Sequence, residues 1–310
     1  MDTELIHRQK KQVVERFGEW TAHNIQLKDD LWTIRKGIAG DEIKLRRVIQ
    51  VVCDTAGRPL HDLRILDLAC LEGLYAIEFA HHGAEVLAIE GRQANIAKAR
   101  FAKQVLSLDN VKFIQDDVRN LSKEKYGTFD VVLCLGILYH LDAPDVFTFV
   151  ENISNVCRGV AVIDTHVSPK PEKSHIWREK ELWGRAYTEH DAGSSPEERQ
   201  KALWASLDNT TSFWLTRPSL YNLLSLAGFT SAYECYVPIE PDKPVDRITI
   251  CAVRGESQEL ICCPLMNAEP VRNMPEDSGN HVSKPSGRLH KVSKFVLRPA
   301  KRLIGELLHH

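Results

Sequence analysis

The sequence predicts a doubly wound α/β fold with a mostly parallel sheet, and two observations favour this class. From residue 64 onward, short β-rich runs alternate with helical patterns, and the β-rich runs are apolar on nearly every residue. Strands that are apolar on both faces belong to a sheet that helices cover on both sides. The 310-residue chain is 43% hydrophobic and 26% charged, which is enough apolar material for one such domain with additions.

The expected elements follow in chain order. The first five strands are RILDL (64–68), EVLAIE (85–90), VKFIQ (111–115), FDVVLCL (129–135) and GVAVIDT (159–165). Helices are expected at about 73–83, 93–107, 144–156 and 218–227, with a brief helical segment after residue 115. Helical crossovers make the first strands parallel, whereas SAYECYV and RITICAVR, joined by a short turn-like segment, are predicted to pair antiparallel.

Composition divides the chain into four segments. They are a helical N-terminal cap (1–58), the main domain (59–254) with a lid insertion at about 167–217, a flexible linker (255–286) and a basic amphipathic C-terminal segment (287–310). The insertion is polar, contains four of the six tryptophans and shows no β signal. The linker is rich in Pro, Ser, Asn and acids and has no periodicity.

Charge and cysteine content indicate the setting. The formal net charge of -2 gives no strong nucleic-acid signature. Eight cysteines without a CxxC pair, and the lack of a signal peptide or a long apolar run, favour a cytoplasmic protein. The C-terminal segment fits either peripheral contact with an anionic membrane or a solvated tail. Its basic residues are Lys284, Arg288, Lys291, Lys294, Arg298, Lys301 and Arg302.

Polar residues follow four of the predicted strands, at the sheet edge where ligands bind in doubly wound folds. The strands run into Asp67 with a turn closing at Gly73, into Glu90-Gly91-Arg92, into Asp116-Asp117-Val118 and into Leu135-Gly136 through Tyr139-His140. Glu90 lies 23 residues beyond Asp67, a spacing that places an acid to bind both ribose hydroxyls of a nucleoside. Such an acid taken singly also fits a helix N-cap.

Together, ILDLACLEG, LAIEGR, VKFIQDDVRNL and FDVVLCLGILYHL resemble the class I S-adenosylmethionine-dependent methyltransferases over about residues 60–165, and more loosely to 253. The resemblance implies a seven-stranded, Rossmann-like sheet with an antiparallel closing strand, and S-adenosyl-L-methionine as cofactor. The residues it assigns to the cofactor are Asp67, Ala69 and Gly73 for the methionine part, Glu90 with Gly91 for the ribose, Asp117 and Val118 for the adenine, and Leu135 and Gly136 for the methyl-bearing sulfonium. The family usually has glycine where this chain has Ala69 and Leu71, so the turn departs from its pattern.

The sequence says less about the residues that bind the methyl acceptor. A hydroxyl acceptor needs a base, and the candidates are His166 and His140, followed by His190, each of which also fits a structural histidine. Tyr139 and Trp214 offer rings for stacking, and Arg217 offers a partner for an acidic acceptor. The N-terminal stretch FGEWTAHNIQLKDDLWT is expected to form part of the pocket or to pack on the core. No metal site is predicted, because no spacing enforces one on Asp164, Glu189, His190 and Asp191.

The leading interpretation is a methyltransferase that acts on a small polar acceptor, through O-methylation of a sugar or a natural-product intermediate. One alternative is RNA methylation, because GILYH and the layout also resemble enzymes that modify the wobble uridine of tRNA. Another is a cofactor-binding protein without catalysis. An NAD-dependent dehydrogenase is disfavoured because the first strand is not followed by GxGxxG. The attacked atom and the oligomeric state stay open.

Overall fold

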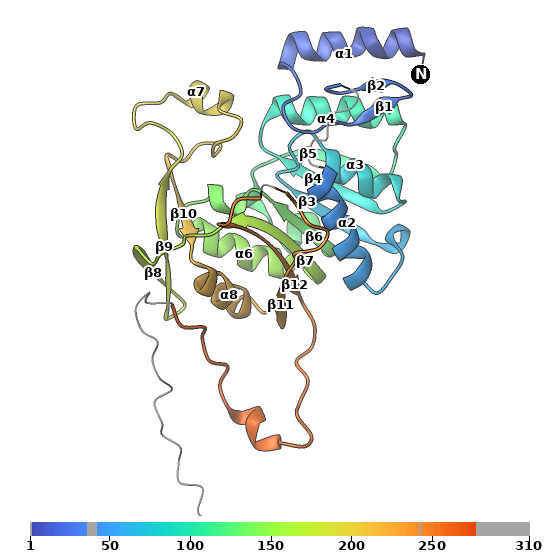
Figure 1. Ribbon diagram of the computed structural model, residues 1–310. Coiled ribbons are helices and arrows are strands. Elements are labelled where there is room, and N and C mark those ends of the chain that lie inside the picture. The colour runs from blue at the N-terminus through green and yellow to red at the C-terminus, as the bar shows by residue number, and fades with distance from the viewer. Residues whose placement is uncertain (1, 36–41, 242, 277–310) are drawn as a thin grey trace, which may run out of the picture. The chain divides into compact units, whose positions relative to one another are not determined.

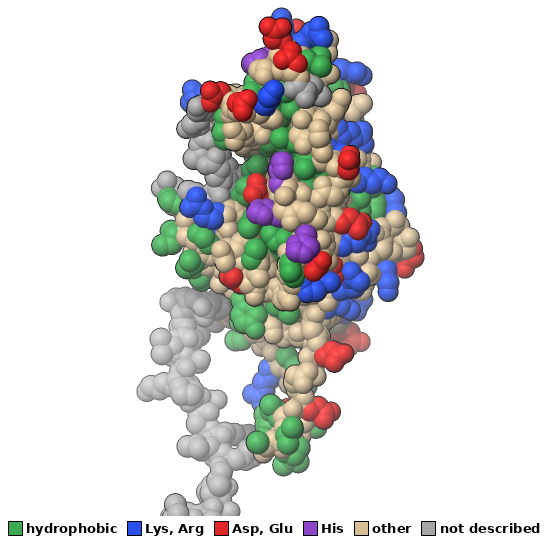
Figure 2. All heavy atoms as spheres, turned by 90° about the vertical axis from the view of Figure 1, so that its right-hand side faces the viewer, with side chains coloured by type: hydrophobic (Ala, Val, Ile, Leu, Met, Phe, Trp, Pro, Cys, Tyr) green, Lys and Arg blue, Asp and Glu red, His purple; other side chains and the backbone are tan. Residues whose placement is uncertain are grey.

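The structure is a computed structural model, which describes residues 2–35, 42–241 and 243–276. The predicted basic segment 287–310 lies outside these residues, as do residues 277–286 of the predicted linker. No helix in the described ranges is long and apolar enough to cross a membrane. On the face shown in Figure 2, Lys and Arg side chains stand among Asp and Glu side chains, as the small net charge suggests.

The centre of the structure is a seven-stranded sheet, which confirms the predicted fold class (Figure 1). In spatial order its strands are β11 (Ser231–Glu234), β12 (Arg247–Val253), β7 (Cys157–His166), β6 (Phe129–Leu135), β3 (Arg64–Leu68), β4 (Glu85–Glu90) and β5 (Val111–Gln115). β12 is antiparallel to both of its neighbours, and the other neighbouring strands are parallel. The strand order therefore reverses direction next to β3, where a doubly wound sheet opens a crevice for ligands.

Helices cover both faces of the sheet (Figure 1). One face carries α2 (Glu42–Thr55), α3 (Leu74–His81) and α4 (Gln93–Leu106), and α1 (Thr3–Phe17) packs on α4. The other face carries α5 (Lys123–Tyr126), α6 (Asp145–Val156) and α8 (Arg217–Leu226). Short 3-10 helices are η1 (Leu60–Asp62), η2 (Val118–Asn120) and η3 (Leu138–His140).

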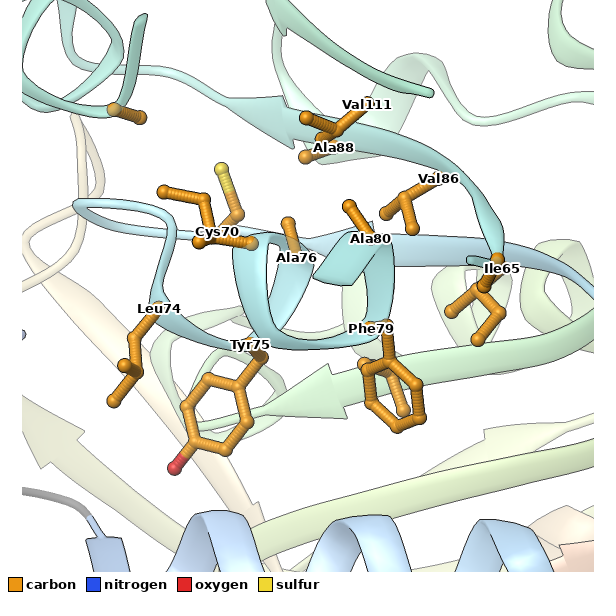
Figure 3. Close-up of a cluster of buried hydrophobic side chains, with 14 of the residues drawn as sticks. Ile65, Cys70, Leu74, Tyr75, Ala76, Phe79, Ala80, Val86, Ala88 and Val111 are labelled. Carbon is orange, nitrogen blue, oxygen red and sulfur yellow. The ribbon is translucent and has the colours of Figure 1, made fainter. Parts of the chain in front are cut away.

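Successive strand residues enter different hydrophobic clusters, because side chains alternate between the faces of a sheet. Ile65 and Val131 belong to the cluster beneath α2, α3 and α4, whereas Leu66 and Val132 belong to the cluster beneath α6 and α8. Figure 3 shows the first cluster around α3, whose Phe79 is fully buried. This two-sided burial explains why the strand sequences are apolar without alternation.

The predicted lid insertion contains β structure, which corrects the expectation that it has none. Strands β8 (Lys173–Trp177), β9 (Lys180–Thr188) and β10 (Thr211–Leu215) form an antiparallel sheet in the order β10-β9-β8, and α7 (Pro196–Lys201) follows β9. Residues of β9 alternate between buried and accessible, with Leu182 fully buried. A sheet with one accessible face needs few apolar residues, so its hydrophobic signal is sparse.

The N-terminal cap is only partly helical. A two-stranded hairpin, β1 (Gln26–Lys28) and β2 (Leu31–Trp32), separates α1 from α2. Asp29 adopts a left-handed backbone with φ of 35° in the turn, a conformation that Asp tolerates better than most residues. The predicted cap therefore contains the two helices α1 and α2 together with a hairpin that the sequence analysis did not predict.

The described part of the predicted linker, residues 255–276, is exposed and contains one 3-10 helix, η4 (Pro264–Ala268). Its end returns to α8 (Figure 1). There the Glu276 carboxylate accepts hydrogen bonds from the hydroxyls of Thr216 at 2.8 Å and Ser219 at 2.6 Å. The segment therefore packs against the domain at its far end.

Candidate active site

A cavity of about 240 Å³ lies at the carboxyl ends of β3, β4, β5 and β6. The residues that line it come from these strand ends, from the N-terminal segment and from residues 203–209 of the insertion. Ten predicted site residues meet there: Asp67, Ala69, Glu90, Gly91, Asp117, Val118, Leu135, Gly136, Tyr139 and His140. The structure thus brings the cofactor candidates together with one candidate base.

The turn after β3 has a glycine-like backbone although it carries one glycine. Ala69 and Leu71 have φ of 53° and 49°, and Gly73 has φ of 89°. A left-handed conformation costs a residue with a Cβ roughly 1–2 kcal/mol, so the turn is under strain at two positions. Gly73 does not line the cavity, and a Cβ on it would lie 2.9 Å from the Phe113 ring. The predicted need for close approach at Gly73 therefore comes from packing beneath the turn.

Asp67 is buried at the end of β3, with 1% of its surface exposed. Burial, and to a smaller degree the nearby charge of Glu90, raise the pKa of Asp67 to about 8, although a hydrogen bond from the Ala76 backbone opposes the shift. Oδ2 of Asp67 has no hydrogen-bond partner among the described residues. A cationic ligand in the cavity would favour its ionised form, so Asp67 fits a cofactor that carries sulfonium and ammonium groups.

Glu90 connects the turns after β3 and β4. Its Oε2 accepts a hydrogen bond from the Leu71 backbone N–H at 3.0 Å. Its Oε1 accepts from the Arg92 backbone N–H at 2.8 Å and from Asn95 Nδ2 at 3.3 Å. Burial raises the pKa of Glu90, although these hydrogen bonds and the Arg92 charge oppose the shift. Glu90 therefore holds the strained turn in place, and Oε2, which accepts one hydrogen bond, has a further lone pair for a ligand.

Asp116 and Asp117 both line the cavity and both have partners in the chain. Burial raises the pKa of Asp116, but hydrogen bonds from Lys125 and Tyr126 bring it down to about 2. Asp117 caps η2 by accepting from the Arg119 backbone N–H at 2.8 Å and forms an ion pair with the Arg119 side chain. The preference for Asp117 as the adenine ligand stays a prediction.

His140 is held by a buried carboxylate from the insertion. Its Nδ1 lies 2.9 Å from Oε2 of Glu189, whose side chain is 1% exposed. Burial alone would raise the pKa of Glu189, but hydrogen bonds from His140 and Ser212 keep it below its usual range. An ionised carboxylate accepts only, so Nδ1 must be the donor, and in neutral His140 the lone pair is on Nε2. His140 is thus oriented as a base.

The remaining predicted residues do not line the cavity. His166 stacks on Trp214 with ring centroids 4.9 Å apart, and its Nδ1 lies 3.2 Å from Oδ1 of Asp246. Burial and the charge of Arg247 lower the pKa of His166. Trp214 is 6% exposed, so it packs within the insertion. Both rings contact Tyr139, with centroids 4.8 Å and 5.9 Å from its ring, so His166 and Trp214 lie behind a residue that lines the cavity.

Arg217 and His190 also have partners outside the cavity. Nε of Arg217 lies 2.9 Å from Oε1 of Glu234 on β11. His190 Nε2 lies 2.9 Å from the Ser206 carbonyl oxygen within the insertion. No group of three metal-ligating side chains with suitable geometry occurs in the described parts of the chain.

The N-terminal segment contributes to the site through a contact that the sequence did not reveal. Glu72, fully buried in the turn, accepts from the backbone N–H groups of Thr21 at 2.9 Å and His23 at 3.1 Å. Lys98 Nζ lies 3.1 Å from Glu72 Oε1. Nδ1 of His23 in turn accepts from the Leu74 backbone N–H at 3.1 Å. These contacts hold His23 at the wall of the cavity. The N-terminal segment thus lines the pocket, which is one of the two roles expected for it from the sequence.

Two cations that line the cavity were also missed, Lys44 of α2 and Arg247 of β12. Both face Asp164, which is fully buried on β7. No sequence signal links these three residues, because they lie far apart in the chain and follow no motif.

Comparison with known proteins agrees with this geometry. Residues 65–159 match a family model described as "Methyltransferase domain". These residues span β3 to the start of β7 and include the strand ends that line the cavity. The chain contains a methyltransferase domain. The predicted methyltransferase family is confirmed for these residues, and the predicted fold is confirmed by the seven-stranded sheet.

Curated relatives of the methyltransferase domain include enzymes named ubiquinone biosynthesis O-methyltransferase. The protein of Acinetobacter baumannii (strain AYE) is 33% identical over 81 residues, which are 26% of this chain and 34% of the relative. That of Rickettsia akari (strain Hartford) is 32% identical over 152 residues, or 47% of this chain and 57% of the relative. The matches thus span about a third to three-fifths of these enzymes.

A solved structure resembles most of the chain. The N-terminal domain of EvdMO1, in the presence of SAH and D-fucose, matches with a TM-score of 0.61 and 22% sequence identity. The match covers 82% of this chain and 97% of that domain. This likeness shows that the fold extends beyond the methyltransferase domain matched by the family model.

Proposed function

We propose that this protein transfers the methyl group of S-adenosylmethionine to an oxygen atom of a small polar acceptor, such as a sugar or a natural-product intermediate. The observation that carries the proposal is His140, which is paired with Glu189 and lines the same cavity as the strand-end residues of the methyltransferase domain. A hydroxyl acceptor must lose a proton as the new bond forms, and a histidine held by a carboxylate supplies the base.

In this mechanism the residues of the chain bind and orient the reactants. Glu90 holds the ribose, Asp117 and Val118 the adenine, and Asp67 with the turn after β3 the methionine part. The cofactor supplies an electrophilic methyl group on a sulfonium. His140 takes the acceptor proton on Nε2, and Glu189 stabilises the imidazolium that results. Positioning two reactants in a closed site can contribute roughly 7–11 kcal/mol to lowering the barrier.

The proposal is supported by two names among the compared proteins. The curated relatives are O-methyltransferases by name, and EvdMO1 was solved in the presence of a sugar. An oxygen acceptor of modest size is consistent with both, and with a cavity that the insertion lines in part.

The test begins with mass spectrometry of small molecules that copurify with the protein, followed by transfer of labelled methyl groups to a panel of hydroxylated acceptors. His140→Gln should lower turnover by about 100- to 10,000-fold while binding of S-adenosylhomocysteine stays nearly unchanged. His166→Gln is the matched control, because His166 lies outside the cavity. Full activity of His140→Gln between pH 6 and 9, or loss of activity only in His166→Gln, would refute the assignment of the base.

A further inference from the structure

Residues 260–266, with the sequence LICCPLM, form an exposed apolar tip on the segment that follows β12. Figure 1 shows this segment as an arm that extends beyond the sheet, carries η4 at its far end and then returns toward α8. All seven residues of the tip are exposed, Ile261 by 92% and Leu265 by 86%. Figure 2 shows hydrophobic side chains gathered at this end of the arm. Neighbouring exposed apolar side chains of this size mark a contact with a partner or a membrane.

The tip has a defined structure of its own. Asn267 closes it, because its Oδ1 accepts a hydrogen bond from the Leu260 backbone N–H at 2.9 Å and its Nδ2 donates to the Leu260 carbonyl oxygen at 3.2 Å. Within the tip, the Met266 backbone N–H donates to the Cys263 carbonyl oxygen at 3.0 Å. A short closed loop therefore presents the apolar side chains, and part of its backbone is already paired before any contact forms.

The tip protrudes and is uncharged, which suits a soft apolar phase. No charged residue interrupts positions 260–266, and Glu259 and Glu269 stand at either end of this stretch. Such a group can enter the boundary between the headgroups and the acyl chains of a bilayer, where its side chains leave water. The two glutamates stay in water, so they limit how deeply the tip enters.

The distribution of charge along the chain indicates that the membrane is anionic. The whole chain has a formal net charge of -2, yet residues 277–310 contain the seven basic residues named in the sequence analysis and two acids, Asp277 and Glu306. Positive charge is thus concentrated in the sequence that directly follows the arm. Each basic residue near an anionic leaflet strengthens binding by about fivefold, which offsets the repulsion of the acids in the arm.

We propose that residues 260–266 insert into the surface of an anionic membrane, to which the basic sequence after residue 276 is attracted. The tip supplies apolar burial and the basic sequence supplies electrostatic attraction, a combination that gives reversible peripheral binding. The inference does not depend on the proposed function, because the tip lies outside the residues that line the cavity.

The first experiment measures binding to vesicles. Full-length protein is sedimented at physiological salt with vesicles of phosphatidylcholine and phosphatidylglycerol in equal parts, and separately with vesicles of phosphatidylcholine alone. We expect the mixed vesicles to bind about tenfold more tightly or better. Ile261→Ser combined with Leu265→Ser should weaken this binding by about 10- to 100-fold, because two apolar side chains no longer leave water.

A matched control removes exposed apolar side chains elsewhere. Val245 and Ile239, which are 97% and 76% exposed, lie between β11 and β12. Val245→Ser combined with Ile239→Ser should bind the mixed vesicles as wild type does. A general loss of surface hydrophobicity would instead weaken both double variants alike.

The second experiment reports where the tip lies. Cys262 and Cys263 are exposed in the tip, and Cys53 is exposed on α2. In Cys53→Ser protein a thiol-reactive, polarity-sensitive dye labels the tip, and its emission should shift to the blue when mixed vesicles are added. In Cys262→Ser combined with Cys263→Ser the dye labels Cys53, and its emission should stay nearly unchanged. Both proteins also carry Cys235→Ser, because that cysteine is half-buried.

Neutralising the basic sequence tests the electrostatic part. Lys291→Gln, Lys294→Gln, Lys301→Gln and Arg302→Gln, combined in the full chain, should weaken binding to the mixed vesicles by about 10- to 100-fold. The remaining binding should depend little on salt, whereas binding of the Ile261→Ser, Leu265→Ser protein should keep the salt dependence of wild type.

Three results would overturn the proposal. Wild-type protein that does not sediment with mixed vesicles does not bind an anionic membrane. Equal binding of wild type and the Ile261→Ser, Leu265→Ser protein would show that the tip is not the contact. Wild-type dimers in the absence of lipid that become monomers in this double variant would make the tip an interface between two copies of the chain. Circular dichroism of every variant confirms that it is folded.

Discussion

Replacing Asp67 with asparagine should make the protein more stable relative to wild type as pH rises. In the folded protein burial raises the pKa of Asp67 from its usual 3.8 to about 8. The unfolded chain therefore ionises this group first, so wild type loses stability as pH rises from about 4 through 8. Each pH unit in this window corresponds to roughly 1.4 kcal/mol, and asparagine removes the whole dependence.

The expected change in stability is large enough to measure within a narrow pH range. Between pH 5.5 and 7.5 the free energy of unfolding of Asp67→Asn, relative to wild type, should increase by about 3 kcal/mol. The substitution also lowers stability by a constant amount at every pH, because an N–H₂ group at the Oδ2 position has no hydrogen-bond partner among the described residues. Urea unfolding at four pH values measures how the stability difference between Asp67→Asn and wild type changes with pH, and the constant cost of the unpaired amide does not affect that change.

A matched control separates this site from general acid titration. Asp62→Asn changes an acid whose side chain is 54% exposed, and it should follow the wild-type pH profile. Asp67→Asn should also weaken S-adenosylmethionine binding, and wild-type affinity should rise with pH up to about 8, because the cationic cofactor favours ionised Asp67. Parallel stability profiles of wild type and Asp67→Asn would refute the reasoning.

Four further substitutions test the turn and its supports. Leu71→Gly should raise the free energy of unfolding by about 1 kcal/mol, because φ of Leu71 is 49° and glycine adopts this backbone without strain. Gly73→Ala should lower the free energy of unfolding, because the new Cβ would lie 2.9 Å from the Phe113 ring. Urea unfolding measures both changes, and changes of the opposite sign would contradict this reasoning. Glu72→Gln leaves Lys98 buried without its carboxylate, and should cost about 3–5 kcal/mol and expose the N-terminal segment to proteases; unchanged stability and protease resistance would show that this ion pair does not hold the segment. Glu90→Ala should weaken S-adenosylhomocysteine binding by roughly 1.5–3 kcal/mol in calorimetry, and unchanged affinity would remove it from the ribose site.

The sheet was predictable because each of its strands carries its own signal. RILDL and FDVVLCL are apolar at most positions, and in the structure their alternate apolar residues enter clusters on opposite faces of the sheet. The insertion was not predictable in this way. β9 buries Leu182 but leaves its last three residues exposed, so its pattern resembles that of a loop. Local patterns report burial on both faces more reliably than burial on one.

The site residues on the strands were predictable from the sequence, whereas those in the insertion were not. Asp67 and Glu90 were found because strand ends gather at one edge of the sheet, and their positions follow from the strands. His166 and His140 were both candidate bases, and of these two His140 lines the cavity. The residue that decides between them, Glu189, lies 49 positions after His140 in the insertion, and pairing across that distance has no sequence pattern.

Arg92 joins the two halves of the site. Its backbone N–H donates to Oε1 of Glu90, and its guanidinium donates to five backbone carbonyls of the insertion, including that of Ser206 at 3.1 Å. The Ser206 backbone N–H donates in turn to Glu189 at 2.8 Å, and Glu189 holds His140. A contiguous chain of hydrogen bonds therefore runs from the expected ribose ligand to the base. Because carbonyl acceptors are common to all residues, no side-chain pattern in the insertion could indicate this link, through which the fold of the insertion on Arg92 orients the proposed base.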